Sequence, residues 1–240
     1  MKQRLDRLLV ERGLAETREK AQALILAGEV LVNGQKGLKA GHTIDVSSII
    51  QVMAPLPYVS RGGGKLAAAL DAFEIDVAGK VAMDVGSSTG GFTDCLLQRG
   101  AARVHAVDVG SGQLDWKLRN DSRVVLHEGV NARYLRVDDI GELVDFISCD
   151  VSFISVTLIL PAVVPLLRPG GRMVILVKPQ FEAGKGEVGK GGIVRRPELH
   201  EQACRRVSEA VAALGFETTI MDSPILGAEG NKEFLLYARH

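Results

Sequence analysis

From residue 80 onward, short apolar runs alternate with segments of helical periodicity. The runs fall at residues 81–86, 104–110, 124–130, 144–150 and 171–178, with two more near 216–221 and 233–238. Helical patterns fall between them, over 93–100, about 154–167 and about 197–214. Apolar strands that alternate with helices indicate a mostly parallel sheet covered on both faces. We therefore expect an α/β fold for this part of the chain.

The first 50 residues follow a different pattern. Leucines recur at helical spacing over residues 5–9, and Thr17 can cap a second helix over 18–27. Residues 30–32 and 44–46 are typical of short strands, and an Asn-Gly pair between them predicts a hairpin. These elements predict a small α+β unit with a minimal core.

Residues 52–60, VMAPLPYVS, hold two prolines and little periodicity. Proline fixes the backbone in an extended form, so this stretch is expected to be a stiff linker. We therefore expect one domain over residues 1–59 and a second over 60–240.

Composition narrows the class of protein. The 240 residues are 46% hydrophobic and 24% charged, which suits a folded core and excludes a disordered chain. Lys+Arg and Asp+Glu are 29 each, but residues 1–65 hold ten bases against six acids. A basic head therefore precedes an acidic body. The three cysteines are far apart and offer no disulfide framework or paired metal ligands, so a reducing compartment fits best.

Export and membrane insertion are not expected. The first 13 residues are charged throughout and lack the apolar core of a signal peptide. The longest uncharged run, residues 151–167, contains two prolines and three hydroxyl residues, so it fits a strand end and a core helix better than a membrane span. A cytoplasmic protein is expected.

The head resembles a known module. The segment RLDRLLVERGLAETREKAQALILAGEVLVNGQ, with its Gly-x-Val-x-Val-Asn-Gly ending, is similar to the S-four RNA-binding domain over residues 4 to about 50. From charge alone, a solvated helix face is the simpler interpretation, because acids lie among the bases. The resemblance favours contacts with phosphates of structured RNA, which position RNA without reading its sequence. The candidate contacts are Arg4, Arg7, Arg18, Lys20, Lys36 and Arg61.

Two strand ends predict a nucleoside site. The first strand of the body runs into DVGSSTGGF, residues 84–92, and the second ends at Asp108, whose carboxylate can accept both hydroxyls of a ribose. A dinucleotide loop needs G-x-G-x-x-G, whereas the spacing here is G-x-x-x-G-G, so a cofactor without pyrophosphate is favoured. Glycines that serve only as turns would leave Asp108 unexplained.

This pattern resembles the fold that binds S-adenosylmethionine (SAM), and Arg-Pro-Gly-Gly before the fifth strand is a turn common in it. The resemblance implies a Rossmann-like methyltransferase fold with a seven-stranded, mostly parallel sheet containing one antiparallel strand. It implies SAM as the cofactor. The candidate cofactor-binding residues are Asp84, Gly86, Ser87, Ser88, Gly90, Gly91, Phe92, Asp108 and Asn131.

A second glycine-rich segment needs separate consideration. Residues 184–190 satisfy G-x-x-x-x-G-K, but Gly191 stands where a phosphate loop needs Ser or Thr to hold magnesium. Five glycines over 184–192 fit a lid better than a phosphate loop.

Four ionisable residues stand at positions that this topology can bring together. Lys65 opens a helix, Asp150 and Lys178 end the fourth and fifth strands, and Glu233 begins the last strand. A lysine at the end of an apolar strand loses hydration, which favours its neutral amine, and two carboxylates would fix its orientation. From the residues alone, a buried ion-pair network is an equally good interpretation.

Lys-Asp-Lys-Glu in this order on such a fold resembles the FtsJ-type RNA ribose 2′-O-methyltransferases. The head together with SRGGGKL, DVGSSTGGFTD and VKPQFE resembles the TlyA family over nearly the whole chain. The resemblance implies methyl transfer from SAM to a ribose 2′-hydroxyl of cytidine in ribosomal RNA or ribosomal subunits, without a metal. Lys178 would be the base and Asp150 would orient it, while Lys65 and Glu233 would tune the site and place the ribose.

Two positions depart from that family: Arg196 stands where relatives usually have Asp, and Ser87 where many have Ala. Two other functions stay open. One is an RNA-binding or ribosome-assembly factor whose methyltransferase fold is inactive. The other is a membrane-active haemolysin, a label that many members carry, although the sequence shows no export signal or spanning segment.

Overall fold

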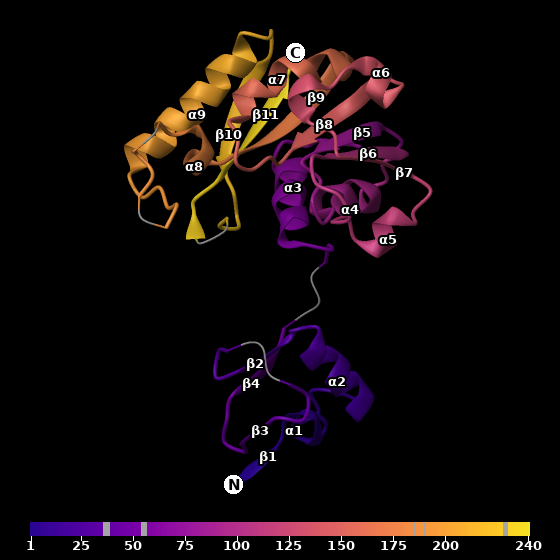
Figure 1. The fold of residues 1–240 in the computed structure, drawn as a ribbon, viewed down its shortest axis with the longest axis vertical. Coiled ribbons are helices and arrows are strands. Elements are labelled where there is room, and N and C mark those ends of the chain that lie inside the picture. The colour runs from indigo at the N-terminus through magenta and orange to yellow at the C-terminus, as the bar shows by residue number, and fades with distance from the viewer. Residues whose placement is uncertain (36–38, 54–56, 185, 190, 228–229) are drawn as a thin grey trace. The chain divides into compact units, whose positions relative to one another are not determined.

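The computed structural model describes residues 1–35, 39–53, 57–184, 186–189, 191–227 and 230–240 (Figure 1). These residues form two compact units, Met1–Leu56 and Pro57–His240. Each unit has its own hydrophobic core, so each is described by itself.

The second unit is built on a seven-stranded sheet. Its strands are β5 (Val81–Val85), β6 (Arg103–Asp108), β7 (Val124–Glu128), β8 (Val144–Cys149), β9 (Leu167–Val177), β10 (Glu217–Asp222) and β11 (Phe234–Arg239). Their order in space is β10-β11-β9-β8-β5-β6-β7. Only β11 runs antiparallel to its neighbours, β9 and β10. The predicted mostly parallel sheet with one antiparallel strand is confirmed.

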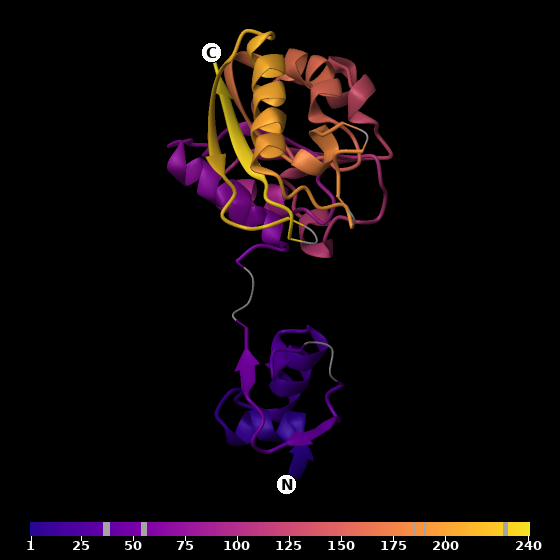
Figure 2. The same cartoon turned by 90° about the vertical axis from the view of Figure 1, so that its left-hand side faces the viewer.

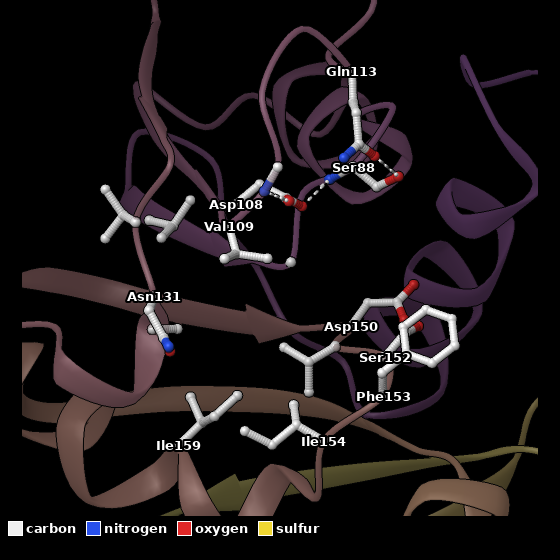
Figure 3. Close-up of a pocket in the computed structure, with 16 residues that line it drawn as sticks. Ser88, Asp108, Val109, Gln113, Asn131, Asp150, Ser152, Phe153, Ile154 and Ile159 are labelled. Atoms are coloured by element: carbon white, nitrogen blue, oxygen red, sulfur yellow. Dashed lines mark hydrogen bonds between the residues drawn. The ribbon is translucent and has the colours of Figure 1, made fainter.

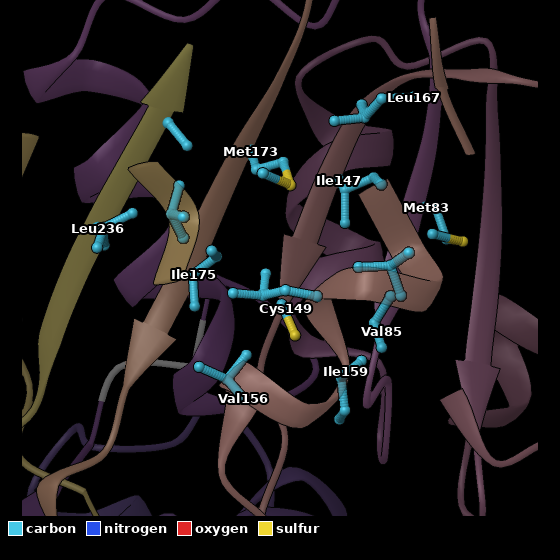
Figure 4. Close-up of a cluster of buried hydrophobic side chains, with 14 of the residues drawn as sticks. Met83, Val85, Ile147, Cys149, Val156, Ile159, Leu167, Met173, Ile175 and Leu236 are labelled. Carbon is cyan, nitrogen blue, oxygen red and sulfur yellow. The ribbon is translucent and has the colours of Figure 1, made fainter. Parts of the chain in front are cut away.

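Helices cover both faces of this sheet (Figures 1 and 2). The helices of the second unit are α3 (Arg61–Ala72), α4 (Gly91–Gln98), α5 (Trp116–Arg119), η1 (Ala132–Tyr134), α6 (Val137–Ile140), η2 (Val156–Leu158), α7 (Leu160–Val163), η3 (Val164–Leu166), α8 (Pro179–Glu182) and α9 (Pro197–Ala212). One core lies between the sheet and α7 and α9, and the other between the sheet and α3, α4 and α5. Side chains of the central strands fill the first core (Figure 4).

The expected continuous helix over 154–167 is wrong. The segment consists instead of the short helices η2, α7 and η3. Pro161 and Pro165 lie in the first turns of α7 and η3. Proline lacks an amide hydrogen and its ring clashes with the preceding helical turn, so one uninterrupted helix cannot include both positions.

The first unit contains two helices and two small antiparallel sheets. Its elements are β1 (Lys2–Arg4), α1 (Leu5–Glu11), α2 (Arg18–Leu26), β2 (Val30–Val32), β3 (Thr43–Asp45) and β4 (Ile50–Val52). β1 pairs with β3 and β2 pairs with β4. The predicted cap of α2 is confirmed, because the amide of Lys20 donates to Thr17 Oγ1 at 3.2 Å.

The expected hairpin between 30–32 and 44–46 is wrong, because β2 pairs with β4 rather than with β3. The Asn-Gly turn is present, but the strand pairing across it is a single bridge between Val32 and Gln35. Asn33 makes two hydrogen bonds with Ile49. Its backbone amide donates to the Ile49 carbonyl, and its side-chain Oδ1 accepts from the Ile49 amide, both at 2.9 Å. These two bonds place β4, not β3, beside β2.

The connection between the units is shorter than the expected linker of 52–60. Val52 belongs to β4, whereas the amide of Val59 donates to Asp94 of α4 at 2.9 Å, within the second unit. Tyr58 packs against α3 so closely that a Cβ on Gly63 would lie 2.3 Å from its ring. This contact requires glycine at position 63, and helix α3 itself begins at Arg61, four residues before the predicted start.

Some sequence predictions concern residues outside the described ones: Lys36, part of the linker (54–56), and positions 185 and 190 of the G-x-x-x-x-G-K segment. Within the described part of the chain, no helix is long and apolar enough to cross a membrane.

Asp84, inside the sheet, generates a stability prediction. Burial raises the pKa of Asp84 to about 7 from 3.8, although Thr93 and Ser148 donate hydrogen bonds to it. The folded state therefore keeps a proton that the unfolded state loses, and the free energy of unfolding falls as pH rises from about 4 to about 7. Asp84→Asn should remove this dependence. In urea unfolding, the free energy of unfolding of Asp84→Asn minus that of wild type should rise by about 1 kcal/mol or more from pH 5 to pH 8.

Asp71→Asn is the matched control for this experiment. A hydrogen bond from Arg99 lowers the pKa of the exposed Asp71, so its protonation does not change between pH 5 and pH 8. Parallel stability curves for wild type and Asp84→Asn over this range would contradict the prediction.

Candidate active site

The loop after β5 is held against the end of β8. Gly86 has φ 83°, and a Cβ on it would lie 2.5 Å from the carbonyl oxygen of Asp150. Only glycine allows both this conformation and this approach. The loop is also fixed to the end of β6, because Asp108 accepts hydrogen bonds from the amides of Ser88 (2.8 Å) and Gly110 (2.7 Å).

A cavity of about 540 Å³ opens at this edge of the sheet (Figure 3). Asp108 and Ser88 line one side, and Ser88 Oγ donates to Gln113 at 3.2 Å. Asn131 and Ile159 lie at the end of the cavity away from Asp150, Ser152 and Phe153, as the figure shows. The cavity thus combines a carboxylate, an amide and apolar walls, the lining typical of a small-molecule site.

The predicted cofactor residues fall into two groups. Gly86, Ser88, Asp108 and Asn131 line the cavity, as does the predicted catalytic residue Asp150. The others are buried behind the cavity wall and do not line it: Asp84, Ser87, Gly90, Gly91 and Phe92.

The buried group supports the loop from behind. Asp84 accepts from Thr93 Oγ1 at 2.7 Å and from Ser148 Oγ at 3.1 Å, which ties β5 to α4 and β8. Phe92 belongs to the core beneath α4. Direct contact of these residues with a cofactor stays a prediction, while the contacts of Asp84 and Phe92 give these two a supporting role.

The amine of Lys178 lies beside the cavity residue Asp150. Its Nζ is 2.6 Å from Asp150 Oδ1 and donates to Ser152 Oγ at 2.8 Å. Asp150 Oδ1 is buried and receives no aligned hydrogen bond from the described residues, so charge rather than hydrogen-bond geometry holds this pair.

Lys65 and Glu233 form a second ion pair. Their Nζ and Oε2 atoms lie 2.5 Å apart, and the two side chains are only 10% and 2% exposed. A Cβ on Gly227 would lie 2.0 Å from Glu233 Oε1, so the backbone there packs directly on the carboxylate. The predicted four-residue cluster is therefore organised as two separate lysine–carboxylate pairs.

Several residues near Lys178 escaped the sequence analysis. Glu182, which is buried, accepts from Ser155 Oγ (2.6 Å) and from the amide of Val156 (2.8 Å), so it fixes the loop that follows β8. Ser152 and Gln113 also gave no signal, because isolated polar residues in loops match no motif.

Phe153 is the most unusual of the residues that were missed. Its side chain is 91% exposed, and its φ of 66° lies in the left-handed region, where a non-glycine residue is strained. Its ring is tilted against Phe181 at a centroid distance of 5.3 Å, and Lys178 Nζ lies 5.9 Å from the Phe181 ring. The exposed Phe153 ring therefore contacts the half-buried Phe181, which in turn lies next to Lys178.

The predicted RNA contacts occupy different environments. Arg4 and Arg18 both bind the buried Asp6, and Lys20 pairs with Glu16. Arg7 is exposed on α1. Arg61 is exposed at the first position of α3, in the second unit.

Among the described residues, no group of three or more His, Cys, Asp or Glu side chains could hold a metal ion. The parallel sheet with one reversed strand is that of the Rossmann-like methyltransferase class, and the cavity lies at the carboxyl ends of its strands, where such folds bind ligands. Residues 58–240 match the FtsJ-like methyltransferase family, and residues 3–50 match the S4 domain. The chain belongs to the FtsJ-like methyltransferase family, in its TlyA group.

Relatives match the chain over nearly its full length. The YqxC protein of Bacillus subtilis is 52% identical over 98% of this chain and 85% of its own. The 16S/23S rRNA (cytidine-2′-O)-methyltransferase TlyA of Mycobacterium tuberculosis is 46% identical over 98% of this chain and 89% of its own. The solved structure of a hemolysin-labelled chain from Streptococcus thermophilus is 46% identical, with a TM-score of 0.77, and covers 99% of this chain and 88% of its own.

The buried pair of Lys65 and Glu233 generates a prediction. Lys65→Met leaves the Glu233 carboxylate buried without its cation, so the free energy of unfolding should fall by about 3–5 kcal/mol. Adding Glu233→Gln removes the uncompensated charge and should restore much of that loss. Guanidinium unfolding of both variants measures the difference.

Lys232→Met provides the control, because the Lys232–Asp222 pair is exposed and should contribute less than about 1 kcal/mol. If the double variant were as unstable as Lys65→Met alone, the loss could not be assigned to an unpaired charge.

Proposed function

We propose that this protein is a SAM-dependent methyltransferase that transfers a methyl group to the 2′-hydroxyl of a cytidine ribose in ribosomal RNA. One observation carries the proposal: the amine of Lys178 lies 2.6 Å from Asp150, and Asp150 lines the same cavity as Asp108. A candidate base and a candidate ribose-binding carboxylate thus belong to one site. The FtsJ-like family and the TlyA relatives support the reaction and the substrate class.

The cavity suits SAM. Asp108 uses its two oxygens to fix backbone amides, and the further lone pairs of a carboxylate can accept the hydroxyls of the cofactor ribose. Gly86 leaves room for a ligand above the sheet, and Asn131 with Ile159 offers a polar and an apolar contact for an adenine. When bound, SAM supplies a methyl group on a positively charged sulfur.

The protein's own contribution to the reaction is alignment and proton transfer. In the displacement, the bond from the ribose oxygen to the methyl carbon forms, the carbon–sulfur bond breaks, and the hydroxyl proton leaves to Lys178. Lys178 can accept that proton only as a neutral amine. Asp150, whose Oδ1 lies 2.6 Å from Lys178 Nζ, would orient the amine toward the ribose hydroxyl.

Lys65 and Glu233 supply a second, more deeply buried pair. We infer that they place the ribose and adjust the charge around the site, as the resemblance to the FtsJ-type enzymes implies. The first unit, with its S4 match and exposed arginines, would hold the RNA.

Phe153 fits a role toward the target nucleotide. The Phe153 ring is 91% exposed on a strained backbone and contacts Phe181, which adjoins Lys178, so it has no function in the core. An unstacked base can stack on such an aromatic side chain. We infer that Phe153 receives the base of the nucleotide whose ribose is methylated.

The first test replaces the proposed base. Lys178→Met should lower methyl incorporation by about 100-fold or more, because proton transfer to the base is lost. SAM affinity and RNA affinity should stay within about threefold of wild type, since the cavity wall and the first unit are intact. Incorporation is measured with tritiated SAM and ribosomal subunits from a strain that lacks this gene, and mass spectrometry locates the methylated ribose.

Lys80→Met, at an exposed lysine before β5, is the control and should retain full incorporation. Wild-type protein that binds subunits but incorporates no methyl group would instead identify an RNA-binding factor with an inactive fold.

The second test concerns Phe153. Phe153→Ala should lower kcat/KM for RNA about tenfold or more, while Phe153→Tyr, which keeps an aromatic face, should stay near wild type. Leu158→Ala removes another exposed apolar side chain and should have little effect. Equal losses for Ala and Tyr at position 153 would argue against stacking.

A further inference from the structure

The first unit contains a buried carboxylate that its small core does not need. Asp6 is fully buried at the start of α1, next to core leucines. It accepts hydrogen bonds from Arg4 Nε (3.0 Å) and Nη2 (2.8 Å), Arg18 Nε (2.9 Å) and Gln22 Nε2 (2.9 Å). Three side chains from two different elements therefore converge on one carboxylate.

The two arginines remain accessible although their partner is not. Their side chains are 40% and 44% exposed. A guanidinium has more N–H donors than these contacts use, so both arginines keep donors for a ligand. A Cβ on Gly41 would lie 3.6 Å from both Nη atoms of Arg4, so the backbone of that loop also packs against this guanidinium.

The local charge is that of an anion site. Two guanidiniums against one carboxylate leave a net positive charge, and the Arg4 contact lowers the pKa of Asp6 well below its usual range, so the carboxylate stays ionised. Arginine side chains are flexible, and ordering them on binding costs affinity unless they are already ordered.

We propose that Asp6 is a positioning residue that holds Arg4 and Arg18 together as a preorganised clamp for one RNA phosphate. The inference rests on the proposed function, in which this unit holds ribosomal RNA. A phosphodiester fits because two oriented guanidiniums can bind its oxygens with paired, charge-assisted hydrogen bonds.

Preorganisation and simple charge make opposite predictions. Removing the negative charge of Asp6 makes the unit more basic, so charge alone predicts tighter RNA binding and a steeper dependence on salt. If Asp6 orders the arginines, its removal weakens binding despite the gain in positive charge.

The decisive variant is Asp6→Asn in the full chain, measured by filter binding to ribosomal subunits from a strain that lacks this gene, at several potassium chloride concentrations. We expect about tenfold weaker binding, since two long side chains lose their restraint. SAM affinity and the melting transition of the second unit should be unchanged. A folded Asp6→Asn protein that binds subunits as tightly as wild type, or more tightly, would overturn the proposal.

A second variant keeps the test decisive if Asp6→Asn does not fold. Arg4→Lys with Arg18→Lys keeps both positive charges but loses the planar fork that Asp6 holds. Binding should again fall about tenfold, and adding Asp6→Asn to a folded double-lysine variant should cause little further loss, because all three residues act as one unit. Wild-type affinity in the double-lysine variant would reject the clamp.

Arg99 and Asp71 form the matched control. They make the same two-bonded Arg–Asp contact, at 2.6 and 2.9 Å, on the surface of the second unit. Arg99→Lys and Asp71→Asn should leave subunit binding unchanged. If they weakened it equally, a general loss of arginine–carboxylate pairs would explain the result and the clamp would be rejected.

The two proposals fail in different ways. A wild-type protein that binds subunits but never methylates them would refute the proposed chemistry and leave the clamp testable by binding alone. Normal methylation and normal binding by folded Asp6→Asn would refute only the clamp.

Discussion

The close approach of β5 to β8 is the constraint on which the rest of the site depends. The amide of Asp150 donates to the Val85 carbonyl at 2.9 Å, which extends the parallel pairing one step past the strand ends. Gly86 follows at once, and its backbone touches the Asp150 carbonyl so closely that any side chain would collide with it. The loop that faces the proposed cofactor and the carboxylate that faces the proposed substrate are therefore fixed by one backbone contact. A methyl transfer depends on alignment to a fraction of an ångström, and backbone pairing supplies this more rigidly than side chains alone could.

Carboxylates fix the positions of loops and of a predicted catalytic lysine in the second unit. Asp108 fixes two loop amides, Glu182 fixes the loop after β8, and Glu233 holds Lys65. Replacing a buried ion pair with apolar residues of similar size is often neutral or stabilising, so such a pair is weak evidence for a stabilising role. The buried Glu182 and Glu233 are therefore better explained by the position they impose on neighbouring groups than by any gain in stability.

The sequence predicted the sheet and the placement of the chemistry well, for a physical reason. Strands of a parallel sheet end at one edge, so locating the apolar runs was enough to bring Asp108, Asp150 and Lys178 to that edge. Prediction from the sequence failed where a single contact between residues far apart in the chain decides which strands pair. The partner of β2 is set by Asn33 holding Ile49, 16 residues away, and no local pattern records that bond. Phe153 lies in a run whose other apolar residues are mostly buried or half-buried, so its exposure could not be inferred from hydrophobicity. The sequence did offer one unused signal: Asp6 stands among the leucines that form the core of the first unit, where an unpaired acid would not be tolerated.

For the proposed binding of RNA, the local distribution of charge matters more than the net charge of zero. The first unit, Met1–Leu56, holds eight bases against six acids, while the acids of the second unit are mostly engaged in ion pairs or accept hydrogen bonds from backbone amides. Each predicted catalytic lysine is matched by one carboxylate, so neither pair adds net charge to the proposed site. Under the proposed function, such neutral pairs would neither attract the RNA backbone strongly nor repel the positive sulfur of SAM. The first unit would then supply most of the RNA affinity, and the paired residues of the second unit would supply alignment.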